Sequence, residues 1–87
     1  MLSENHWCFI CGNPKGLEKH HCISGTANRK LADKPEYDLT VWLCHQCHRD
    51  LHDKGFYKRE LQQYAQKHFE KTHSREEFRK IFGRSYL

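Results

Sequence analysis

The residues of this chain best suited to chemistry lie in one short stretch, from Cys44 to His52. Cys44 and Cys47 form a C-x-x-C pair, the spacing that allows two thiolates to bind one zinc ion. His48 and His52 are four residues apart, so on a helix they lie on the same face, one turn from each other. The histidine pair could therefore bind a different metal ion, and the rest of the chain must supply the partners of both pairs.

A second C-x-x-C pair lies near the start of the chain, where Cys8 and Cys11 precede Gly12. This pattern is typical of a zinc knuckle, in which a glycine takes a backbone angle that a side chain would resist. Four thiolates complete a tetrahedral shell and leave no position for a substrate, so the sequence predicts a structural zinc site. The alternative is four buried cysteines without a metal. The fifth cysteine, Cys22, is interpreted as a small core residue.

Two strands and a helix are expected to carry the histidines. Alternation predicts a strand over residues 17–23, with Leu17, Lys19, His21 and Ile23 on one side. The run from Leu39 to Leu43 is rich in β-branched and aromatic side chains and predicts a second strand. A helix should begin near Gln46 and run to Asp53 or Lys54, with Gly55 as its stop signal, and a short helix is expected over residues 27–34, capped by Thr26.

This arrangement would bring His20 and His21 of the first strand toward His48 and His52 of the helix. A hydrolytic metal site needs a few nitrogen or oxygen ligands, with coordination positions left open for water and phosphate. A separate imidazole must accept a proton from the attacking water, and histidine suits this role because its reference pKa lies near neutral pH. A purely structural role for the four histidines is the alternative.

The C-terminal part of the chain is expected to be helical and basic. A helix from Tyr57 to about Lys71 should bury a stripe of side chains along one face. A capping box predicts a last helix from Ser74 to Gly83. The net charge of the 87 residues is +4, and this excess lies from Tyr57 onward, with eight Lys and Arg against four Asp and Glu. Such a tail suits a polyanionic partner or simply solvated helix faces. The expected stripe consists of Leu61, Tyr64, Ala65, His68 and Phe69.

Length and composition set further bounds. At 87 residues the chain is predicted to be one domain, short enough to need a metal for stability. It contains no apolar run long enough for a signal peptide or a membrane span, which predicts a cytoplasmic protein without a membrane partner.

The His20-His21 doublet, the strand ending at Cys44 and the C-x-x-C-H-x-x-x-H run resemble an HNH endonuclease of the ββα-metal type. The small zinc-stapled phage and bacterial members are the most similar. The resemblance implies that His20, His48 and His52 hold one catalytic divalent metal, Mg²⁺, Mn²⁺, Ni²⁺ or Zn²⁺, and that His21 is the general base. It implies cleavage of DNA to 5′-phosphate and 3′-hydroxyl ends. The family's middle Asn is missing before the second strand, where Asp38 could orient an imidazole instead.

We therefore expect an α+β fold, a treble-clef or ββα-metal zinc domain with two additional C-terminal helices. One nuclease domain would span residues 1–87, with a zinc-stapled core over 8–54 and a helical extension over 57–87. DNA contacts are expected from Arg29, Lys30 and Arg49, and phage packaging or recombination proteins are conceivable partners. The alternatives are a non-catalytic zinc-finger DNA-binding module with the same fold and a protein-interaction treble clef.

Overall fold

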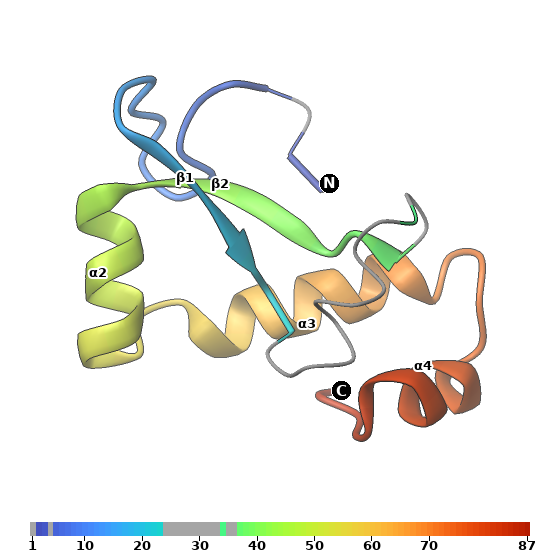
Figure 1. The fold of residues 1–87 in the computed structure, drawn as a ribbon. Helices are drawn as coiled ribbons and strands as arrows, with labels where there is room; N and C mark the ends of the chain where they lie inside the picture. Colours follow the sequence, from blue (N-terminus) through green and yellow to red (C-terminus); the bar gives the residue numbers. More distant parts are fainter. Residues whose placement is uncertain (1, 4, 24–33, 35–36) are drawn as a thin grey trace.

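A two-stranded antiparallel sheet and three helices form the part of the chain described by the computed structural model, namely residues 2–3, 5–23, 34 and 37–87 (Figure 1). The predicted α+β class is confirmed at this level. The short helix expected over residues 27–34, its cap Thr26, and the candidate DNA contacts Arg29 and Lys30 lie almost wholly outside the described residues.

The sheet pairs β1 (Leu17–His21) with β2 (Thr40–Cys44), and Leu17 lies opposite Cys44. The first strand ends two residues earlier than predicted and the second lies one residue later. Opposed residues share a face of an antiparallel pair, so Glu18 and His20 lie on the same face as the buried Val41 and Leu43. This face is therefore the inner one, and His20 points into the molecule rather than to solvent.

Helix α2 (His45–Lys54) follows β2 directly. Cys44 is its N-cap, and the Cys44 Sγ accepts a hydrogen bond from the Cys47 N–H. The helix ends at Gly55, whose φ of 73° is the left-handed conformation that glycine adopts without strain. The predicted stop at Gly55 is confirmed, and the helix begins one residue earlier than expected.

Helix α3 (Lys58–Phe69) lies under the sheet and packs through a buried stripe of Leu61, Ala65 and Phe69 (Figure 1). The prediction was wrong for two members of this stripe, because Tyr64 and His68 are exposed. Gln66 is instead fully buried, on a side of the helix that the C-terminal residues cover.

The buried Gln66 amide has a partner for each polar atom that it directs inward. Its Nε2 donates to Glu70 Oε2 at 2.7 Å and to Ser85 Oγ at 3.0 Å. Its Oε1 accepts the Tyr86 N–H at 2.6 Å. These bonds fasten the C-terminal segment to α3, and they explain how a polar side chain is tolerated in the interior.

The last helix, α4 (Arg75–Phe82), begins and ends at its predicted signals. The Ser74 Oγ accepts the Glu77 N–H at 3.1 Å, and Gly83 ends the helix with a φ of 92°. Phe78 is fully buried and meets Phe69 at a ring-centroid distance of 5.5 Å. Among the residues described, no helix has both the length and the apolar character needed to cross a membrane.

Candidate metal centres

The four cysteines of the two C-x-x-C pairs come together at the junction of β2 and α2. Their sulfur atoms all lie within 4.8 Å of one another, and the Sγ atoms of Cys11 and Cys44 are 3.6 Å apart. Zinc–sulfur bonds of about 2.3 Å at tetrahedral angles require sulfur separations of about 3.8 Å. The cluster of Cys8, Cys11, Cys44 and Cys47 therefore fits a structural metal such as zinc.

In each cysteine pair the backbone N–H of the second cysteine points at the sulfur of the first, in a turn for Cys8 and Cys11 and at the start of α2 for Cys44 and Cys47. The Cys11 N–H points at Cys8 Sγ at 3.4 Å, and the Cys47 N–H points at Cys44 Sγ at 3.5 Å. Gly12 closes the first turn with a φ of 82°, as its place in the sequence predicted. A hydrogen bond from the Phe9 N–H to the Trp42 carbonyl, at 2.8 Å, attaches this turn to β2.

The electrostatics of the cluster call for a cation. Burial raises the pKa of Cys8, but nearby backbone N–H groups, that of Cys11 first, lower it to about 6. Burial raises the pKa of Cys47, and the neighbouring thiols of Cys44, Cys11 and Cys8 raise it further. Four neighbouring thiols cannot all lose their protons unless a positive charge lies between them. A bound Zn²⁺ would supply that charge.

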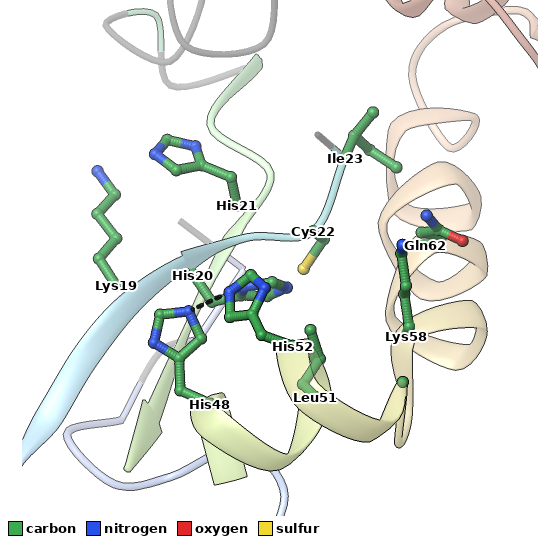
Figure 2. Close-up of a pocket in the computed structure, with 11 residues that line it drawn as sticks. Lys19, His20, His21, Cys22, Ile23, His48, Leu51, His52, Lys58 and Gln62 are labelled. Carbon is green, nitrogen blue, oxygen red and sulfur yellow. Dashed lines mark hydrogen bonds between the residues drawn. The ribbon is translucent and has the colours of Figure 1, made fainter. Parts of the chain in front are cut away.

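Three histidines form a second cluster on the inner face of β1. The ligating nitrogens of His20, His48 and His52 all lie within 4.8 Å of one another. The Nε2 atoms of His48 and His52 are 3.0 Å apart, as Figure 2 marks. Two nitrogens bound to one metal at about 2.1 Å are separated by about 3.0 to 3.4 Å at octahedral or tetrahedral angles. The three imidazoles could hold one metal ion.

His20 is prepared for ligation by its surroundings. Its residue is only 8% exposed, and its ring lies 5.2 Å from that of His48 and 5.7 Å from that of His52. Burial, followed by the proximity of these histidines, lowers the pKa of His20 to about 4. At neutral pH the ring is therefore uncharged, and only an uncharged imidazole offers a lone pair to a metal.

Glu18 is a site residue that sequence reasoning missed. Its Oε1 accepts a hydrogen bond from His48 Nδ1 at 2.8 Å, and its Oε2 contacts His45 Nδ1 at 3.2 Å. The bond from His48, followed by that from His45, lowers the pKa of Glu18. A proton fixed on His48 Nδ1 leaves Nε2 free to ligate, the usual task of a carboxylate behind a metal-bound histidine. The signal was available, because residues two apart on a strand share a face, as Glu18 and His20 do.

A pocket of about 380 Å³ opens beside the histidines. Figure 2 shows His48 and His52 on one side, with Lys58 and Gln62 of α3 across from them. Cys22 also lines the pocket but is 4% exposed, and burial raises its pKa to about 12, which agrees with its interpretation as a core residue.

The remaining predicted site residues lie elsewhere. His21 lines the pocket but lies outside the three-histidine cluster, and Figure 2 shows its ring directed away from that cluster. Arg49 is exposed and pairs with Asp53 on α2 at 3.4 Å. Asp38 accepts a hydrogen bond from Thr40 Oγ1 at 2.7 Å and lies 3.7 Å from the Lys19 ammonium. An orienting role for Asp38 toward His21 stays a prediction.

The function of this chain must be argued from these two centres. A scan against protein-family models, a search of curated proteins and a search of solved structures each return no match to it.

Proposed function

We propose that this protein is a metal-dependent HNH endonuclease that hydrolyses DNA phosphodiester bonds. The observation that carries the proposal is the convergence of His20, from a strand, with His48 and His52, from the helix that follows the paired strand. A cysteine cluster lies at the start of that same helix. A zinc finger needs only the cysteines, so the second, partly open set of ligands calls for a further function.

At the level of the fold, the proposal includes a zinc-stapled ββα-metal or treble-clef arrangement. The knuckle at Cys8 and Cys11, the sheet and α2 follow one another in the order that this arrangement requires. Zinc at the cysteines would fix the start of α2 and hence the direction of its histidines.

The four histidines would have two roles in the proposed reaction. His20, His48 and His52 would hold one divalent metal, which when bound supplies Lewis-acid stabilisation of the charge that builds up on the phosphate. Glu18 would keep His48 in the ligating tautomer. His21, at the pocket wall, would accept a proton from the attacking water. The products would carry 5′-phosphate and 3′-hydroxyl ends.

The second candidate is a non-catalytic zinc-finger module that binds DNA with the same fold. Two observations favour it: the ring of His21 is directed away from the histidine cluster (Figure 2), and the segment Asp38-Leu39-Thr40 that leads into β2 contains no asparagine. The module predicts one tightly held zinc ion and no cleavage, whereas the nuclease predicts an additional, exchangeable ion.

The deciding experiment combines metal counting with plasmid cleavage. Purified protein would be assayed on supercoiled plasmid with Mg²⁺, Mn²⁺, Ni²⁺ or Zn²⁺ added in turn, beside the variant His48→Ala with His52→Ala. We expect cleavage with at least one ion and its loss in the variant, whose cysteine-bound zinc remains. Cleavage by neither protein, with a single zinc ion in each, would favour the DNA-binding module.

A further inference from the structure

The histidine pocket does not end at the histidines. A second pocket of about 700 Å³ shares Gly55, Lys58 and Gln62 with it and continues to the C-terminal segment, where Arg59 and Arg84 line it. The two pockets therefore adjoin at the start of α3. Together, under the name trough, they extend from the histidine cluster to the residues that follow α4.

Basic side chains lie along the trough, and the one at the histidine end, Lys19, is paired with Asp38 at 3.7 Å. The other side-chain cations of the trough are Lys58 in the middle, and Arg59 and Arg84 beyond. No Asp or Glu is among the described residues that line either pocket. Within the described part of the chain, Lys58, Arg59 and Arg84 form no ion pair, so their charges are available to an anion.

Only some of the exposed basic residues in the C-terminal part of the chain line the trough. Lys67 and Lys71 at the end of α3 and beyond, and Arg79 on α4, are also exposed but line neither pocket. The Arg84 guanidinium lies 5.1 Å from the centre of the Tyr86 ring. The Tyr86 backbone N–H is bonded to the buried Gln66, so Arg84 is held beside α3 rather than on a loose end.

We propose that the helical extension binds the DNA backbone, with Lys58, Arg59, Gln62 and Arg84 contacting phosphates next to the one at the histidine cluster. This inference rests on the proposed nuclease function, because the histidine cluster defines where the cleaved phosphate would lie. A regular polyanion suits a trough in which cations follow one another and whose described lining contains no Asp or Glu side chain. The extension would thus place the strand for cleavage as well as stabilise the fold.

The first test measures binding without any added second metal. One variant combines Lys58→Gln, Arg59→Gln and Arg84→Gln, and a control of equal net charge combines Lys67→Gln, Lys71→Gln and Arg79→Gln. Each phosphate contact contributes about 0.9 to the slope of log affinity against log salt, so the trough variant should lose about 2.7. Its affinity for a short duplex should then fall about 40-fold less than that of wild type between about 50 and 200 mM salt. The control should keep the wild-type slope.

The second test separates the trough from the histidine cluster. Bis-nitrophenyl phosphate has a single phosphate and can bind at the histidine cluster without reaching Arg59 and Arg84, whereas plasmid DNA can span both. A second trough variant, which combines only Arg59→Gln and Arg84→Gln, keeps Lys58 at the histidine pocket. It should cleave plasmid at least about tenfold more slowly than Lys67→Gln with Arg79→Gln but hydrolyse the small diester at the wild-type rate. Thermal melts and zinc content would confirm that both variants are folded.

The outcomes distinguish the two proposals. If both triple variants flatten the salt slope equally, or if the second trough variant cuts plasmid as fast as its control, the trough proposal is wrong while the nuclease stands. If the wild-type protein cuts neither substrate with any metal, yet only the trough variant flattens the salt dependence of DNA binding, the trough proposal stands and the nuclease proposal fails.

Discussion

Neighbouring residues of the His20-His21 doublet lie in different surroundings because a strand directs successive side chains to opposite faces. His20 lies on the inner face, is 8% exposed and belongs to the histidine cluster that could hold a metal ion. His21 lies opposite Thr40, at the last position of β1, and lines the pocket wall. The two rings are thus chemically distinct despite their adjacency.

The proposed roles predict different losses for the two alanine variants. His20→Ala should lose both the exchangeable metal and cleavage, because a ligand is gone. His21→Ala should keep both metals and DNA binding but cut about a hundred- to ten-thousand-fold more slowly, the usual contribution of a general base. Calorimetric metal titration and plasmid cleavage would measure both effects. Release of the metal by His21→Ala, or its cleavage at the wild-type rate, would show that the roles are wrongly assigned.

Glu18 should control the affinity of the histidine cluster for its metal. Glu18→Ala removes the acceptor for His48 Nδ1, so the metal affinity of the cluster should fall about 10- to 100-fold. In Glu18→Gln the affinity should fall less, because an amide oxygen still accepts the hydrogen bond. Titration with Co²⁺ or Ni²⁺ would measure the change. Glu60→Ala, at an exposed glutamate of α3, is the matched control. Equal affinity in the Glu18 and Glu60 variants would contradict the assignment.

At the scale of elements, Cys44 has three structural duties. It is the last residue of β2, the N-cap of α2 and a member of the cysteine cluster. The direction of α2 relative to the sheet therefore depends on the cluster, and so does the convergence of His20 with His48.

Loss of one cysteine of the cluster should unfold the domain. Cys47→Ser should abolish tight zinc binding and with it a contribution on the order of 10 kcal/mol to the free energy of folding. This loss is as large as the whole free energy of unfolding of a typical domain of this size. Circular dichroism melting and zinc content would measure this. Cys22→Ala changes a buried cysteine outside the cluster, so it should keep its zinc and a cooperative melt. If Cys47→Ser without zinc melted like the wild-type protein, the assignment of the cysteine cluster as a structural metal site would be wrong.

The ends of the elements were predictable where the signal is local. Ser74, Gly55 and Gly83 act on backbone groups within a turn of themselves, and the structure places them at the predicted ends. The burial of Gln66 in place of His68 was not predictable. Its cause is the contact of Ser85 and Tyr86 with α3. These two residues lie far from Gln66 in the sequence, beyond α4.

At the scale of the whole molecule, Gln66 joins the middle of the extension to its end. Gln66→Ala would leave the Tyr86 N–H without its buried partner and open a void, so stability should fall by about 2–4 kcal/mol. Denaturant unfolding would measure this against Lys67→Ala, which changes the exposed neighbour. Equal stability of the two variants would mean that the C-terminal segment is held by other contacts.

The candidate site was predictable in its ligands but not in its walls. The spacing of four cysteines and of His48 and His52 fixes which side chains can meet, since zinc knuckles and helices have constant geometry. That Lys58 and Gln62 face the histidines depends on the turn through Gly55 and Tyr57, which returns α3 across the end of α2. Such a turn sets a direction that periodicity within either helix does not contain.

The adjacency of Cys47 and His48 gives the protein an order of assembly. In the proposed nuclease, an ion at the cysteines would fix the first turn of the helix that carries His48 and His52, two of the proposed ligands of the second ion. Loading of the histidines then requires prior loading of the cysteines, and by reciprocity the second ion tightens the hold on the first. A newly made chain would stay harmless to DNA until it had acquired zinc. Zinc supply would thus limit when the proposed activity appears, although the zinc at the cysteines would take no part in the cleavage itself.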